Sequence, residues 1–530
     1  MKRPRNDYSS RSLTACLLLI AILILVSFVP PMEVWGVELR RANILSEFVS
    51  FEEAEEALPS ISEAEVELIE VDWEQVAEQV AATTAEEPLA EEPAPERHLR
   101  WVLTESQREA TAPLWPDSLP LPAEAKVRIE DFDTLGRGLF DSLYQKLLMR
   151  RPVRIAFLGD SFVEGDILTA DLREQLQLSF GGSGVGFAPM ASPLTGFRRT
   201  VRTTSKGWTS HNIMQWAKSS EEVKRSFTVA GWVCSPINGA STRWVGTDFR
   251  QGADRWDGAN LWFLSRSESR VEVIVNDTLS RVFEVEADES LRRIEVCLEG
   301  MQALECRILS GAEGFVGYGA QLFGNEGVVV DNYSVRSNNG RAMFWSSPAL
   351  NAQHQAQVPY DLVILQYGLN IMQQGVFGYS NYGRQIEQMV DFVRQCFPGA
   401  AVLVMGVSQR WVKGEGGYAP MDALGSMVAS QRAAAERTGA AFWPTSEAMQ
   451  ALGGMDAFVR NGWAGKDYTH INYGGGRQIA GALFRALYAD LYAYWQRETE
   501  HRIQRAEEQP LLNSELVDVQ LFNPSFELNP

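Results

Sequence analysis

Short apolar segments that alternate with helical segments constrain the fold of this chain more than any other feature. Three hydrophobic runs, 155–158, 362–365 and 401–405, have the length and composition of buried strands. Segments whose apolar residues have helical spacing follow these runs or lie between them, at 166–180, 383–396, 426–438 and 476–495. Alternating strands and helices predict an α/β fold, with a parallel sheet flanked by helices. In such sheets, sites form beyond the carboxyl ends of the strands.

The region from about 226 to 330 has a different pattern. Short strand-like runs separated by turn residues occupy 227–233, 260–264, 271–275, 282–285, 293–298 and 304–309. No convincing helix interrupts them, which predicts an antiparallel β-sandwich inserted into the α/β domain. We therefore expect the α/β domain in two parts, 126–225 and 331–496, around an insert at 226–330 and before a tail at 497–530.

The N-terminal segment has the pattern of an export signal. Four basic residues are followed by a 17-residue apolar run at 13–29 and then by two prolines: Lys2, Arg3, Arg5, Arg11, Pro30 and Pro31. Residues 1–36 are therefore predicted to be a signal peptide or an uncleaved membrane anchor. The folded part would then be exported, to the periplasm or the cell envelope.

Acidic residues are concentrated in one segment. The formal net charge is −20, and residues 42–96 contain 17 Asp and Glu with no Lys or Arg. Like-charge repulsion predicts that 37–125 is an acidic, largely disordered spacer. The rest of the chain is near neutral, which argues against a nucleic-acid-binding protein.

Ser161 is the candidate nucleophile. The tripeptide Gly159-Asp160-Ser161 stands between the apolar run 155–158 and a helical segment, so Ser161 is expected on a tight turn with its hydroxyl exposed. Asp160 is expected to hold this turn through hydrogen bonds to nearby N–H groups. The alternative is a serine that only caps the helix.

His470 is the candidate general base, because an imidazole with a near-neutral pKa can take a proton from serine and return it to a leaving alcohol. Asp467, three residues earlier, would orient the ring. Among the other histidines, His211 is the one rival and is a candidate to line the cleft, whereas His354 is expected in a polar linker. No cysteine or histidine cluster suggests a metal site, and no cofactor is expected.

The remaining catalytic requirement is an oxyanion hole. The side chain of Asn370 and the backbone N–H groups of Gly340 and Ser161 are the candidate donors. Gly368 would let the backbone approach the substrate closely.

These motifs resemble the four blocks of the SGNH (GDSL-like) hydrolases: Gly159-Asp160-Ser161, Gly340, Gly368-x-Asn370 and Asp467-x-x-His470, in that order. The resemblance covers about 130–225 and 328–495 and implies a flavodoxin-like sheet. The longer string from Gly159 to Thr169 and the glycine-rich 181–187 look more like bacterial envelope members. That group includes peptidoglycan O-acetylesterases, which have a β-sandwich between the first two blocks. Ile371 departs from the family pattern, where many members have Asp.

By this resemblance Ser161, Asp467 and His470 form the triad, and Ser161, Gly340 and Asn370 form the oxyanion hole. The implied activity is a serine esterase that removes O-acetyl groups from an acetylated envelope or extracellular polysaccharide. The alternatives are a polysaccharide O-acetyltransferase on the same fold and a non-catalytic carbohydrate-binding envelope protein.

Two further features are open from sequence. Cys297 and Cys306 are spaced to face each other across a hairpin centred near Met301, either as a disulfide or as two buried thiols. Four tryptophans of the β region are either sugar-stacking platforms or core residues: Trp232, Trp244, Trp256 and Trp262.

Overall fold

The computed structural model describes residues 32–34, 37–39, 71–84, 98–104, 115–134, 136–193 and 196–521, and of 32–34, 37–39, 83–84, 98 and 506–521 the backbone alone. The chain divides into two compact units, Met1–Ser60 and Ile61–Pro530. In the first, β1 (Met32–Val34) pairs antiparallel with β2 (Val37–Leu39). The predicted signal or anchor at 1–36 lies almost wholly outside the described residues. Among the described helices, none is both long and apolar enough to cross a membrane.

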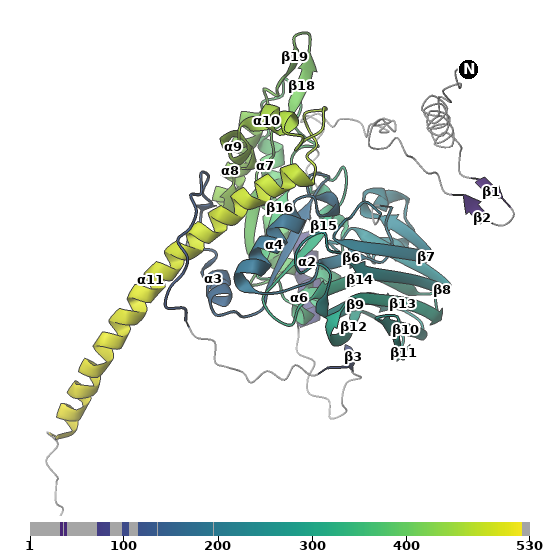
Figure 1. The fold of residues 1–530 in the computed structure, drawn as a ribbon, viewed down its shortest axis with the longest axis horizontal. Helices are drawn as coiled ribbons and strands as arrows, with labels where there is room; N and C mark the ends of the chain where they lie inside the picture. Colours follow the sequence, from purple (N-terminus) through teal and green to yellow (C-terminus); the bar gives the residue numbers. More distant parts are fainter. Residues whose placement is uncertain are drawn as a thin grey trace, which may run out of the picture. The chain divides into compact units, whose positions relative to one another are not determined.

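A six-stranded sheet forms the centre of the second unit (Figure 1). Its order is β15 (Val328–Ser334), β5 (Val153–Gly159), β16 (Leu362–Gln366), β17 (Ala401–Met405), β20 (Ala441–Trp443) and β4 (Glu130–Asp131). The first five strands are parallel, and β4 is antiparallel at the edge. Strand order 2-1-3-4-5 is flavodoxin-like, so the predicted α/β fold class is confirmed.

Two groups of helices pack against this sheet. One group contains α3 (Asp141–Leu148), α4 (Thr169–Phe180), α9 (Thr445–Ala451), α10 (Gly454–Arg460) and α11 (Tyr473–Leu521). The other contains α2 (Trp73–Thr84), α6 (Pro348–Gln357), α7 (Ser380–Cys396) and α8 (Leu424–Thr438). Strands such as β16 are buried along their whole length because helices cover both faces.

A ten-stranded, mainly antiparallel sheet makes up the inserted β region (Figure 1). Its strands are β3 (His98–Val102), β6 (Gly186–Pro189), β7 (Val201–Asn212), β8 (Trp232–Gly246), β9 (Trp256–Ser265), β10 (Ser269–Val275), β11 (Leu279–Val285), β12 (Asp288–Met301), β13 (Ala303–Ser310) and β14 (Phe315–Phe323). Strand β8 connects its two halves, because Cys234 pairs with β14 while Ser241–Val245 pair with β13. A separate apolar core fills the space between these halves.

This sheet recruits strands from outside 226–330. Strands β6 and β7 precede residue 226 and pair with β14 and β8, while β3 comes from the acidic segment and pairs in parallel with β12. Conversely, β15 begins at Val328 and belongs to the parallel sheet.

The acidic segment 37–125 is also more structured than its charge suggests. Helix α2 packs on α6 and α7, and Val76 is buried there. Farther along, the carbonyls of Pro116 and Pro120 accept hydrogen bonds from Trp495 and Tyr488 of α11. Apolar residues within an acidic sequence therefore anchor parts of it to the folded unit.

The short elements are connectors. They are α5 (Glu221–Lys224), the hairpin β18 (Trp411–Gly414) and β19 (Gly417–Pro420), and the 3-10 turns η2 (Glu164–Asp166), η3 (Ile213–Lys218) and η4 (Arg341–Trp345). The predicted hairpin around Met301 is wrong, because β12 pairs with β9 and β3 while β13 pairs with β10 and β8. Cys297 on β12 and Cys306 on β13 therefore lie beside different strands, and both are free thiols.

His354 lies in the core and not in a polar linker. Its ring stacks on Tyr360 and lies 4.4 Å from the ring of Trp262, centroid to centroid, where α6 meets the β region. Neither ring nitrogen has a hydrogen-bond partner among the described residues. Burial, together with the positive charges of Arg154 and Arg293, lowers the pKa of His354 to about 3.

This burial predicts a pH-dependent stability. Between the folded pKa of about 3 and an unfolded value near 6.5, the unfolded chain binds one proton more, so stability falls as the pH decreases through this window. Below about pH 6.5, His354 lowers the free energy of unfolding by about 1.4 kcal/mol for each pH unit; above it, His354 has no effect on the pH dependence. His354→Phe should flatten the dependence of the unfolding free energy on pH, measured by urea titration between pH 7 and 4. His501→Phe, at an exposed residue of α11, should keep the wild-type slope; equal slopes for all three proteins would contradict the expectation.

Candidate active site

Ser161 is on the turn that follows β5, as predicted. It is half-buried, whereas Asp160 beside it is fully buried. The Asp160 carboxylate accepts a hydrogen bond from the N–H of Phe162 at 2.9 Å, which holds the turn. A Cβ on Gly159 would collide with Val163 and approach the carbonyl of Gln366 to 3.2 Å, so only glycine permits this tight exit from the strand.

The third motif follows β16, the strand that neighbours β5. Gly368 has φ +126°, and a Cβ there would lie 2.9 Å from Nε2 of Gln431. The side-chain amide of Asn370 donates to Oδ2 of Asp160 and to the carbonyl of Asn338, both at 3.1 Å. These two bonds tie together the three loops that carry the first three motifs.

Gly340 lies in the second of these loops, with φ +94°, and a Cβ there would collide with Met389. Its N–H donates to Oδ1 of Asn338 at 2.9 Å. The oxyanion candidates Gly340 and Asn370 thus lie in the same loop cluster. Both already donate hydrogen bonds to other groups of the protein. A substrate oxyanion has to share or replace those bonds.

Asp467 and His470 form a hydrogen-bonded pair. Nδ1 of His470 lies 2.6 Å from Oδ2 of Asp467, and the backbone N–H groups of Thr469 and His470 bond to Oδ1 at 3.1 and 3.2 Å. Partial burial acts to raise the pKa of Asp467, but these hydrogen bonds outweigh it and lower that pKa. Since Nδ1 faces the carboxylate, Nε2 is the ring atom that can take a proton from a nucleophile.

The loop of His470 borders the turn of Ser161. The hydroxyl of Tyr473 donates to the carbonyl of Gly165 at 2.5 Å, so the start of α11 is fixed to the segment that follows Ser161. Burial raises the pKa of Asp160 to about 7, and the positive charge of His470 is close enough to oppose that increase. Gly165 and Tyr473, which are 308 residues apart, therefore meet at the carboxyl edge of the parallel sheet.

Asp166 is a key residue that the sequence analysis did not single out. It is fully buried with φ +67°. Its carboxylate accepts hydrogen bonds from five side chains: Thr169, Arg173, Arg198, Thr200 and Asn332. Burial acts to raise the pKa of Asp166, but the charges of the two arginines outweigh it and hold that pKa well below its usual range. In the sequence, the only sign of this structural role is that Gly165-Asp166 follows closely after the first motif.

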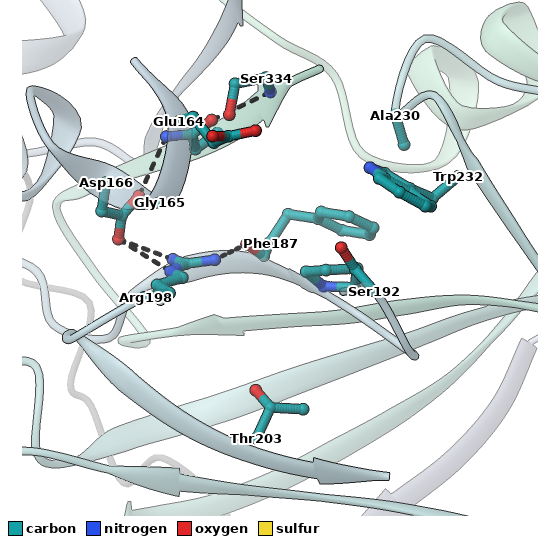
Figure 2. A pocket seen from close by; sticks show the side chains of 12 residues that line it. Glu164, Gly165, Asp166, Phe187, Ser192, Arg198, Thr203, Ala230, Trp232 and Ser334 are labelled. Carbon is teal, nitrogen blue, oxygen red and sulfur yellow. Dashed lines mark hydrogen bonds and ion pairs between the residues drawn. The ribbon is translucent and has the colours of Figure 1, made fainter. Parts of the chain in front are cut away.

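A pocket of about 50 Å³ adjoins the turn of Ser161 (Figure 2). One wall is the turn at 164–166 with Asn332 and Ser334 of β15, and the other belongs to the β region: Phe187, Pro189, Ser192, Arg198, Thr203, Ala230 and Trp232. Figure 2 shows Arg198 below this space, bonded to Asp166 and to the carbonyl of Phe187.

His211 and the four tryptophans have other positions. His211 lies on β7, half-buried, where burial lowers its pKa; its Nε2 is 3.5 Å from the hydroxyl of Ser235, and it does not line the pocket. The tryptophans at 244, 256 and 262 are core residues, at most 2% exposed, so the stacking hypothesis is wrong for them. Trp232 alone of the four lines the pocket.

Within the described residues, no group of His, Cys, Asp and Glu side chains could hold a metal ion.

Comparisons with known proteins identify the fold. No family model and no curated protein matches the sequence significantly. A solved peptidoglycan O-acetylesterase matches with a TM-score of 0.56 and 19% identity, over 69% of this chain and 99% of that one. Carbohydrate esterases of family two from Cellvibrio japonicus (TM-score 0.18, 10% identity, 45% and 85% covered) and Clostridium thermocellum (0.23, 13%, 48% and 92%) match too weakly to define a fold. The chain has an SGNH hydrolase-like fold.

Removing the charge of Asp166 should destabilise the protein. Asp166→Asn leaves Arg173 and Arg198 buried with no carboxylate, and breaking such a buried ion pair costs roughly 3 to 5 kcal/mol. Urea unfolding would measure the loss. Asp254→Asn, at an exposed ion pair with Arg255, should change the unfolding free energy by less than about 1 kcal/mol. A loss at Asp166 no greater than that at Asp254 would contradict the expectation.

The predicted triad implies that Asp467→Asn lowers the turnover of acetyl esters by about 10²- to 10⁴-fold, because the ring of His470 would lose the carboxylate that holds it. Steady-state kinetics with 4-nitrophenyl acetate would measure this. The control is Asp456→Asn on α10, an exposed partner of Arg460. Equal rates for both variants would remove Asp467 from the predicted triad.

Proposed function

We propose that this protein is a serine esterase that removes O-acetyl groups from a cell-envelope or extracellular polysaccharide. The observation that carries the proposal is the Asp467–His470 pair, hydrogen-bonded at 2.6 Å beside the turn of Ser161. The SGNH hydrolase-like fold, similar to that of a peptidoglycan O-acetylesterase, supports this choice of reaction.

In the acylation step, Oγ of Ser161 attacks the acetyl carbonyl carbon while Nε2 of His470 takes the hydroxyl proton. The negative charge on the carbonyl oxygen is stabilised by the N–H groups of Ser161 and Gly340 and the amide of Asn370. The C–O bond to the sugar then breaks, and His470 returns the proton to the sugar oxygen. An acetyl-serine and a free sugar hydroxyl result.

In the deacylation step, water gives a proton to His470 and attacks the carbonyl carbon of the acetyl-serine. The bond from that carbon to Oγ then breaks, His470 returns the proton to Oγ, and the acetyl group leaves as acetic acid, which ionises to acetate. A sugar hydroxyl in place of water would make the same site an acetyltransferase. Apart from the substrate and water, the proposed reaction uses side-chain and backbone groups of this chain.

The polymer and its location belong to the same proposal. An acetylated glycan is the expected partner, and an envelope or extracellular location follows from the basic and apolar N-terminal pattern. Attachment to a membrane through residues 1–36 is part of this hypothesis.

Ser161→Ala tests the proposal. Loss of the nucleophile should lower acetate release from acetylated glycans and small acetyl esters by about 10³-fold or more. A fluorophosphonate probe should label the wild-type protein and leave the variant unlabelled, with Ser219→Ala as the control at a serine that is half-buried like Ser161. Equal ester hydrolysis with Ala at 161 would overturn the nucleophile assignment. Transfer of acetyl to an added sugar, in preference to water, would favour the acetyltransferase.

A further inference from the structure

A two-stranded hairpin stands beside the loop 467–470, which carries two members of the candidate triad. Among the described strands, β18 and β19 pair only with each other, and residues 413–420 are exposed. Figure 1 shows this hairpin at the top of the view, projecting beyond α10. An isolated two-stranded hairpin is only marginally stable in water, so it needs a surface to pack against. The proposed reaction does not by itself explain why the hairpin is there.

The hairpin packs on Tyr468 of the loop 467–470. Trp411 and Tyr418 lie on the same face of the hairpin, because Trp411 is opposite Pro420 and Tyr418 is two residues before Pro420 on β19. Both rings stack on the ring of Tyr468, with centroid distances of 5.4 Å for Trp411 and 4.3 Å for Tyr418. The backbone N–H of Trp411 also donates to the carbonyl of Tyr468 at 3.0 Å. The hairpin is thus attached to the loop by side chains and by the backbone.

The loop 467–470 depends on such support. The side chains of Asp467 and His470 are 49% and 52% exposed, so packing restrains them only in part. Two backbone hydrogen bonds close the base of the loop: Gly465 donates to the carbonyl of His470 at 2.7 Å, and Tyr468 donates to the carbonyl of Gly465 at 3.1 Å. Tyr468 has φ +55°, a left-handed conformation that a tyrosine seldom adopts unless its surroundings impose it. The stacked rings of the hairpin are contacts that impose it.

We infer that the hairpin β18–β19 positions the catalytic loop: Trp411 and Tyr418 hold Tyr468, which keeps the neighbouring imidazole in the orientation that proton transfer requires. The three aromatic residues are positioning residues, since they act on the reacting groups only through the loop. This inference rests on the proposed esterase function and assigns it a support that lies outside the triad and the oxyanion hole. Because a small displacement of a catalytic group can cost about 10²-fold in rate, loss of this support should be measurable.

Tyr418 is the residue to change, because it is 38% exposed and belongs to neither apolar core. Tyr418→Ala should lower kcat for 4-nitrophenyl acetate about tenfold, leave KM within about twofold and keep the wild-type urea midpoint. Tyr418→Phe retains the stacked ring and should therefore retain the wild-type kcat. The matched control is Tyr492→Ala on α11, which removes a partly exposed ring that contacts Trp495 and should leave kcat unchanged.

A double-mutant cycle tests whether the effect passes through Tyr468. In a Tyr468→Ala background the stacking partner is already lost, so Tyr418→Ala should lower kcat by less than about twofold. The same tenfold loss in both backgrounds would overturn the inference, as would equal kcat values for the wild type and Tyr418→Ala.

The substrate dependence separates positioning from direct binding of sugar. An unchanged kcat for 4-nitrophenyl acetate, with a raised KM for an acetylated oligosaccharide, would assign Tyr418 to sugar binding and overturn the inference. Each of these outcomes is measured in an enzyme that needs Ser161, so each leaves the esterase proposal standing. A wild-type protein that hydrolyses no acetyl ester would overturn both proposals.

Discussion

The buried carboxylate of Asp166 is the interaction on which the rest of the site depends. It receives hydrogen bonds from α4, from β15 and from the segment that leads into the inserted sheet. Two arginines offset the cost of burying its charge, and each also reaches a backbone carbonyl, of Val330 and of Phe187. A single anion thus fixes the turn after Ser161 against both sheets. Because uncompensated charges are so unfavourable in a protein interior, separating either arginine from this carboxylate would cost several kcal/mol.

The strand order explains why distant motifs converge. In a 2-1-3-4-5 sheet the order in which strands are added reverses between β5 and β16, which is the position where sites form in such sheets. Ser161 follows β5, and Asn370 follows β16. The hydrogen bonds from Asn370 to Asp160 and to Asn338 join the loops at this position. The loop of His470 reaches the same edge because Tyr473 holds the beginning of α11 against Gly165.

The inserted sheet and the α/β domain contribute different properties to this edge. The candidate triad and oxyanion groups all come from loops of the parallel sheet. The inserted sheet contributes Phe187, Trp232 and Arg198 beside them, and three of its tryptophans serve only as core. This division fits a fold in which the loops of the parallel sheet carry the catalytic groups and the inserted sheet changes which substrate is bound.

Sequence alone determined the features that are local. Apolar runs specify the buried strands, Gly159-Asp160-Ser161 specifies the turn, and Asp467 with His470 is an i, i+3 pair that local backbone can bring together. Tertiary structure decided the rest: the five side chains that bond to Asp166, the hydrogen bond from Asn370 to the carbonyl of Asn338, the burial of His354 and the recruitment of β3, β6 and β7. Each depends on residues far apart in the chain, whose proximity follows from strand pairing and core packing. No local pattern of hydrophobicity or turn residues encodes such contacts.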